Sequence, residues 1–95
     1  MYLRVKSMIP NHLQSLFWDT NLENFNPAEH PEYTIARILE YGDRDAVAWL
    51  KSTFTEAQIV AVLRSERRLS RKSANFWALI YRVAPDDVAA LRVAS

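Results

Sequence analysis

The 95-residue sequence has no cysteine and a single glycine, Gly42, and each shortage excludes a class of site. Without cysteine there is no disulfide, no thiolate metal ligand and no thiol nucleophile, and a reducing compartment is permitted. One glycine cannot build a Gly-rich phosphate-binding loop. No stretch reaches the roughly 20 apolar residues of a membrane span, and the N-terminal residues hold no signal-peptide run. We therefore expect a cytoplasmic protein with no membrane partner.

Residues suited to catalysis are equally scarce. Neither of the two histidines, His12 and His30, has a carboxylate or a second histidine at helical ligand spacing. No Ser/His/Asp arrangement is recognisable, and the acidic residues suit helix caps and solvated faces better than a catalytic pair. The sequence thus predicts a protein with no catalytic residues, no metal and no cofactor. An enzyme acting on a small substrate stays a third and weaker hypothesis.

What the chain does contain is unevenly distributed charge and many aromatic rings. Residues 1–47 carry four basic and seven acidic side chains, a charge of −3, whereas residues 48–95 carry eight basic and four acidic side chains, a charge of +4. Aromatic residues make up 12% of the chain, more than so small a core needs, so one or two rings are expected at an interface. The basic half suits an acidic protein, a polyanion or plain solvent exposure.

Hydrophobic periodicity predicts an all-α fold, a compact bundle of five or six short helices in a single domain of residues 1–95. Residues 1–9 are expected to form a tail or docking arm, residues 10–83 the core, and residues 84–95 a short C-terminal helix. A short helix after Pro10 is expected to begin the core.

Two helices are predicted in the first half of that core. One spans about 31–41 and ends at Gly42, which we interpret as a left-handed residue that stops the helix. The next spans about 44–53, and Asp43 is placed to cap it.

Two more helices are predicted in the second half. Thr55 and Gln58 form a capping box for a helix from 56 to about 67. Ser70 caps the last one, and its apolar residues between Ala74 and Val83 cover most of its circumference, as in a central helix buried on more than one side.

The densest positive charge joins these last two helices. Arg64, Arg67 and Arg68 follow the spacing i, i+3, i+4, and Arg71 and Lys72 open the next helix. A cation near the N-terminus of a helix is repelled by the helix dipole, which costs about 0.3–1 kcal/mol of stability per charge. A bound anion or an acidic partner would turn this repulsion into attraction. Screening of exposed side chains by solvent is an equally simple alternative.

The stretch from Thr55 to Tyr81 can also be interpreted as a helix-turn-helix. Arg71, Lys72 and Asn75 would then lie at the start of a recognition helix and face base edges. Against this, the turn lacks the usual glycine, and the helix beyond Asn75 is too apolar to lie exposed in a groove. DNA binding is therefore the alternative hypothesis.

Three segments carry a resemblance to a family. They are Leu16–Asp19 (LFWD), Arg37–Asp43 (RILEYGD) and Arg67–Leu79 (RRLSRKSANFWAL). They resemble the LFWD, R-x-L-E-Y-G-D and RRLSxKTANFWAL motifs of a family of small bacterial proteins of unknown function, over about residues 13–82. The chain departs from the pattern at Ser73, where the family has Thr, and at Arg71, where Pro is common. Members are often encoded beside nucleotidyltransferase-like toxins of the abortive-infection type, which implies an antitoxin or a regulatory partner.

Residues and resemblance together predict a non-catalytic, antitoxin-like interaction module that binds and neutralises a nucleotidyltransferase-like toxin. The predicted contacts are two aromatic anchors, Trp18 and Trp77, and a set of cations that we call the basic edge. The basic edge consists of Arg64, Arg67, Arg68, Arg71 and Lys72. The alternative is a helix-turn-helix-type transcriptional regulator that contacts DNA through Arg71, Lys72 and Asn75.

Overall fold

The computed structural model describes residues 9–18 and 25–92, and all regular structure in these two ranges is helical. The elements are the 3₁₀ helix η1 (Asn11–Phe17), the α-helices α1 (Pro31–Tyr41), α2 (Arg44–Thr53), α3 (Glu56–Ser65) and α4 (Arg71–Tyr81), and two one-turn 3₁₀ helices, η3 (Pro85–Asp87) and η4 (Ala89–Leu91). The predicted all-α class is confirmed. Within the same two ranges, no helix is long and apolar enough to cross a bilayer.

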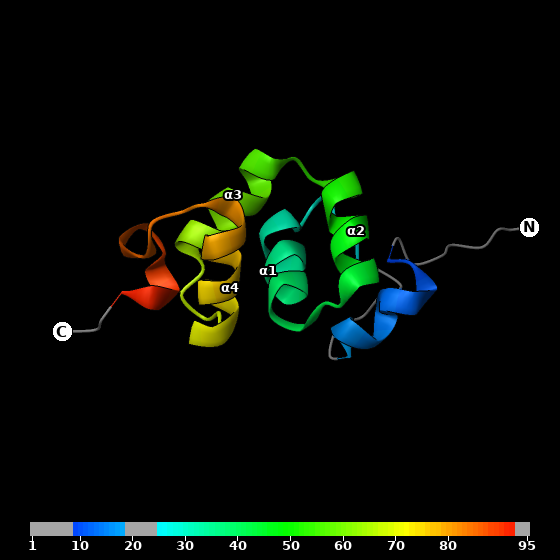
Figure 1. The fold of residues 1–95 in the computed structure, drawn as a ribbon. Coiled ribbons are helices and arrows are strands. Elements are labelled where there is room, and N and C mark those ends of the chain that lie inside the picture. Colours follow the sequence, from blue (N-terminus) through cyan, green and yellow to red (C-terminus); the bar gives the residue numbers. More distant parts are fainter. Residues whose placement is uncertain (1–8, 19–24, 93–95) are drawn as a thin grey trace, which may run out of the picture.

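The centre of the molecule is α1. Its buried residues are Thr34, Ile35, Ile38 and Leu39, and it packs against η1, α2, α3 and α4. Figure 1 shows α1 in the middle, with α2 and η1 on one side and α3, α4 and the C-terminal turns on the other. One core therefore runs through both halves of the chain.

The predicted burial of α4 is wrong. Its buried residues are Ala74, Trp77 and Ala78, all on one face, whereas Leu79 is 80% exposed. Apolar residues around the whole helix predicted neighbours on several sides, but the contacts of α4 with α1, α3 and η4 leave one of its faces, which includes Leu79, exposed. Figure 1 shows α4 between α1 and the C-terminal turns.

The helix caps are those that the sequence predicts. The Asp43 carboxylate accepts a hydrogen bond from the Ala46 N–H at 3.0 Å, and Thr55 and Gln58 form a reciprocal capping box at the start of α3. Each such cap stabilises a helix by about 1 kcal/mol. They set the starts of α2 and α3, although α3 ends at Ser65, two residues earlier than predicted.

Gly42 ends α1, but not for the reason expected. Its φ of −75° and ψ of 150° are extended rather than left-handed. A Cβ at this position would lie 2.6 Å from the Ile38 carbonyl oxygen, so the close passage of the backbone requires glycine. A left-handed residue does end α4, namely Arg82, which follows Tyr81 with a φ of 58°.

Both ends of the described chain join the core. Ile9, which we had assigned to a tail, is 1% exposed, and residues 1–8 of that predicted arm lie outside the described ranges. The predicted C-terminal helix is instead the pair of turns η3 and η4. Val88, between the two turns, and Leu91, in η4, are buried, and η4 packs against α3 and α4.

Candidate partner-binding surface

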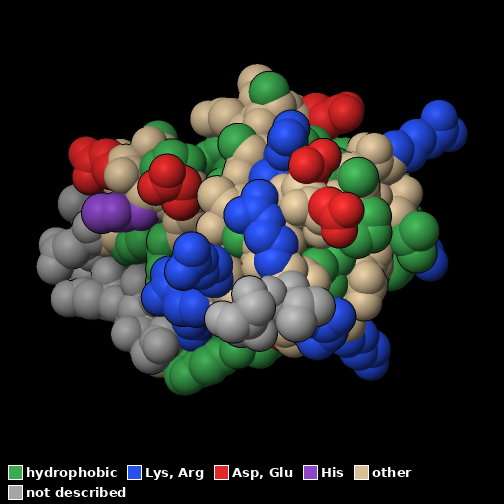
Figure 2. Space-filling model, turned by 90° about the vertical axis from the view of Figure 1, so that its left-hand side faces the viewer, with side chains coloured by type: hydrophobic (Ala, Val, Ile, Leu, Met, Phe, Trp, Pro, Cys, Tyr) green, Lys and Arg blue, Asp and Glu red, His purple; other side chains and the backbone are tan. Residues whose placement is uncertain are grey.

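The basic edge follows the path of the chain from α3 to α4. Arg64 lies in the last turn of α3, Arg67 and Arg68 lie in the connecting loop, and Arg71 and Lys72 occupy the first turn of α4. All five side chains are exposed. Figure 2 views this end of the molecule: Lys and Arg side chains extend from the upper part of the face through its centre to the lower edge, and the Asp and Glu side chains lie in its upper and middle parts.

Arg68 is the one cation of the edge with an ion-pair partner among the described residues. Its Nε donates to the Glu66 carboxylate at 2.9 Å, and its backbone N–H donates to the same oxygen at 3.0 Å. These bonds hold the pKa of the Glu66 carboxyl below its usual value, against the opposing effect of partial burial. The other four cations of the edge are exposed and have no ion pair with a described residue.

The N-terminus of α4 is partly neutralised by the chain itself. The Ser70 side chain accepts a hydrogen bond from the Ser73 N–H at 3.1 Å, and the Ser70 N–H donates to the Glu40 carboxylate at 2.8 Å. Glu40 belongs to α1, so a carboxylate 30 residues away takes the place that we had considered for a bound anion. An acidic partner would therefore meet the side chains of Arg71 and Lys72 rather than the helix end.

Trp18 packs against two side chains of α1, Arg37 and Tyr41. The Arg37 guanidinium lies 4.0 Å from the centroid of the Trp18 ring, and the Tyr41 ring meets the same indole edge-on at 5.2 Å. The Arg37 Nε also donates to the Leu16 carbonyl at 2.7 Å, which ties η1 to α1. Trp18 nevertheless remains 63% exposed, so it keeps surface to offer a partner.

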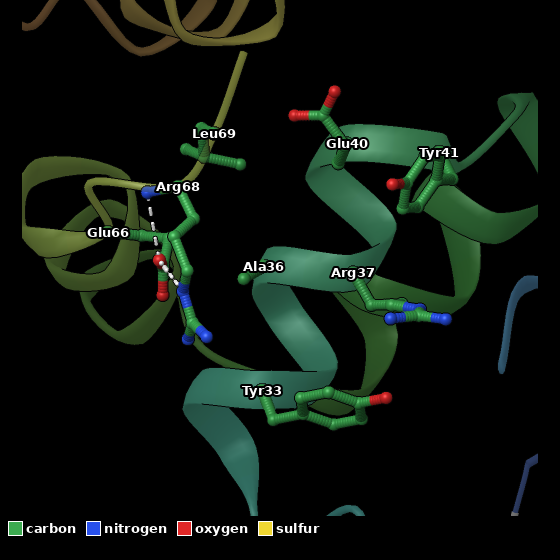
Figure 3. Close-up of a pocket in the computed structure, with 8 residues that line it drawn as sticks. All are labelled: Tyr33, Ala36, Arg37, Glu40, Tyr41, Glu66, Arg68 and Leu69. Carbon is green, nitrogen blue, oxygen red and sulfur yellow. Dashed lines mark hydrogen bonds and ion pairs between the residues drawn. The ribbon is translucent and has the colours of Figure 1, made fainter. Parts of the chain in front are cut away.

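An open hollow of about 180 Å³ lies between this cluster and the basic edge. Figure 3 shows Glu66, Arg68 and Leu69 facing α1 across Ala36, with Arg37 and Tyr41 projecting from the other side of the helix. The two carboxylates that line it, Glu40 and Glu66, already accept hydrogen bonds from Ser70 and Arg68. The hollow thus joins the basic edge to the surroundings of Trp18.

Trp77 has a structural position. It is 7% exposed, and its indole N–H donates to the Leu39 carbonyl at 2.8 Å. That carbonyl lies in the last turn of α1, where the backbone oxygens have no donor in their own helix. Little of Trp77 is left for a partner, and its bond joins α4 to α1.

The surface that sequence reasoning missed is the outer face of α4. Phe76, Leu79 and Ile80 are 53%, 80% and 50% exposed. The signal was present in the sequence, because their spacing of i, i+3, i+4 places them on one face. Asn75, the candidate base-reading residue, is also exposed on this helix.

The histidines do not form a metal site. His12 is exposed, and the His30 ring stacks on Phe25 with centroids 5.5 Å apart. In the described part of the chain, no three His, Asp or Glu side chains come together in a way that would hold a metal ion.

A family model described as "Family of unknown function (DUF6922)" matches residues 13–63, more than half of the chain. The match includes the LFWD and RILEYGD segments and stops immediately before Arg64, so the basic edge and the third motif lie outside it. No curated protein and no solved structure matches the chain.

Proposed function

Because the chain belongs to a family of unknown function, DUF6922, we propose a role from its own surface: a non-catalytic interaction module that binds an acidic protein partner through the basic edge. The observation that carries the proposal is the set of four exposed cations that have no ion pair with any described residue. They are Arg64, Arg67, Arg71 and Lys72. A like-charged cluster of this kind repels itself in the free protein and is relieved by an opposite surface.

The partner that we propose is a nucleotidyltransferase-like toxin, which the module neutralises by binding. The resemblance set out above supports this choice through the genes that neighbour similar proteins. Chemistry supports it as well, because a transferase that binds divalent cations through carboxylates presents an acidic site. Cations such as Arg64 and Arg67, docked at or beside that site, would block substrate access without any catalysis by the module.

Co-expression with a nucleotidyltransferase-like toxin of the kind often encoded beside similar proteins tests this function. The wild-type chain should co-purify with the toxin and restore growth, whereas the double variant Arg64→Glu/Arg67→Glu should do neither. The matched control is Arg44→Glu/Lys51→Glu, which makes the same change in net charge at exposed positions of α2, on the other side of α1. Growth rescue by the charge-reversed edge would remove the basic edge from the mechanism.

DNA binding is the second candidate, and one observation favours it: Arg71, Lys72 and Asn75 are all exposed near the start of α4. The apolar residues that follow on the outer face, Phe76 and Leu79, weigh against it, because base edges and phosphates offer them few apolar contacts. A mobility shift of the chain's own promoter DNA at low salt, with affinity falling steeply as salt rises, would support DNA binding. No shift at low salt would eliminate it.

A further inference from the structure

The outer face of α4 carries a continuous apolar surface with a cation at one end. Leu79 and Ile80 lie three and four residues after Phe76, and Lys72 lies four residues before it, so the four side chains follow one face of the helix. We call these four residues the α4 strip. Its three apolar members are at least half exposed. Contiguous exposed apolar surface on a small protein marks a site of interaction.

The core of the molecule is built on the opposite face of α4. That face packs inward through Ala74, Trp77 and Ala78, and the Trp77 indole is hydrogen-bonded to α1. Within the strip, the Phe76 ring meets the Trp77 ring edge-on at 5.0 Å, but at least half of each apolar side chain stays exposed. A second surface that covered this exposed apolar area would be stabilised by its burial.

We propose that the α4 strip docks an amphipathic helix of an acidic protein partner. The apolar side chains of that helix would pack on Phe76, Leu79 and Ile80, and its carboxylates would meet Lys72 and Arg71. The inference rests on the proposed function, since it assigns the apolar part of the same interface. A helix is the matching shape because residues spaced i, i+3, i+4 form a ridge that packs between the ridges of another helix.

Charge decides between such a partner and a second copy of this chain. The strip begins at Lys72, beside the other cations of the basic edge. It ends at Ile80, two residues before Arg82, which follows the last residue of α4. Two copies paired through their strips in antiparallel fashion would set Lys72 of each near Arg82 of the other, and parallel pairing would set Lys72 against Lys72. Both arrangements bring like charges together, whereas a helix with acidic flanks neutralises them.

The test compares two serine variants of the full chain in calorimetric titrations against the purified nucleotidyltransferase-like toxin. Leu79→Ser/Ile80→Ser removes apolar surface from the strip at positions that are at least half exposed, so the fold should persist. The control, Ala48→Ser/Ala57→Ser, introduces the same two residues at exposed helical positions on α2 and α3. The strip variant should lose at least about 30-fold in affinity, as for a central apolar contact, and the control should keep the wild-type affinity.

The outcomes separate the strip from the proposed function. Full affinity in Leu79→Ser/Ile80→Ser, together with lost affinity in Arg64→Glu/Arg67→Glu, would overturn the strip and leave the function standing. A wild-type dimer in sedimentation that dissociates in the strip variant would identify a second copy as the occupant, against the proposal.

A synthetic probe covers the case in which the toxin does not bind at all. The probe is an amphipathic helical peptide with leucine along one face and glutamate along the other. The measurement is the shift of the backbone amide signals of residues 72–80 when the peptide is added. Shifts that disappear in the strip variant, and with a version of the peptide that carries lysine in place of glutamate, would support the strip even if the toxin does not bind. No shifts with the glutamate peptide would overturn the strip.

Discussion

The bond between α4 and α1 predicts that Trp77→Phe destabilises the fold. Trp77 is 7% exposed, and its indole N–H donates to the Leu39 carbonyl at 2.8 Å. Loss of this bond costs about 0.5–1.5 kcal/mol, rising toward about 3 kcal/mol if the buried carbonyl finds no other donor. The smaller ring also leaves a cavity, which adds about 1 kcal/mol.

Together these effects predict that Trp77→Phe lowers the free energy of unfolding by about 2–4 kcal/mol, a large part of the 5–15 kcal/mol typical of a folded domain. Urea unfolding followed by far-ultraviolet circular dichroism measures the change, with the slope of the transition checked for constancy. The control is Trp18→Phe, because Trp18 is 63% exposed and phenylalanine keeps a ring for Arg37; it should cost about 0.5 kcal/mol or less. If Trp77→Phe lowered the free energy of unfolding no more than Trp18→Phe does, the hydrogen bond between α1 and α4 would not stabilise the fold.

Two further predictions concern single residues. Gly42→Ala should lower the free energy of unfolding by about 1–3 kcal/mol in thermal melts, because its Cβ would lie 2.6 Å from the Ile38 backbone oxygen; an unchanged melting temperature would mean that the backbone yields there at little cost. Glu66 has a lowered pKa in the folded chain, so its stabilising contribution is fully present above its unfolded value and is lost as pH falls through the lowered folded value. In Glu66→Gln, the free energy of unfolding should therefore decrease less than in the wild type as the pH falls below about 4.5. The same pH dependence in both proteins would contradict a stabilising role for the Glu66–Arg68 pair.

The features that could be predicted from the sequence are those whose causes are local. Asp43 caps α2, and Thr55 with Gln58 caps α3, because the donor and acceptor of each cap lie within three residues. The start of α4 follows from Ser70 in the same way. The all-α class follows from these caps together with the apolar stripes between them.

The features that were missed depend on segments far apart in the chain. Glu40 reaches the N-terminus of α4 from 30 residues away, and no local pattern indicates that contact. The burial of one face of α4 depends on where α1, α3 and η4 pack against it, so its apolar residues alone could not separate a buried face from an exposed one. The sequence correctly predicts that α1 ends at Gly42, but it gives the wrong reason, a left-handed conformation. The true reason, the lack of space for a Cβ beside Ile38, is visible only in three dimensions.

The candidate surface was anticipated in part. Arg64 and its four neighbours were named from sequence, and the structure places all five in solvent around one turn. Trp18 was named as an anchor and keeps an exposed ring, whereas Trp77 lies in the core. Whether the exposed residues contact a partner remains a prediction for experiment.

The rate at which the chain associates with a nucleotidyltransferase-like toxin, the proposed partner, tests the proposed interface most directly when it is measured at low and at high salt. Electrostatic steering by the basic edge should make the wild-type rate fall by about tenfold or more between 50 and 300 mM salt. Arg64→Glu/Arg67→Glu should associate slowly at both salt concentrations, and Arg44→Glu/Lys51→Glu should retain the wild-type behaviour. A fast association that responds neither to salt nor to charge reversal at Arg64 and Arg67 would contradict a basic binding surface.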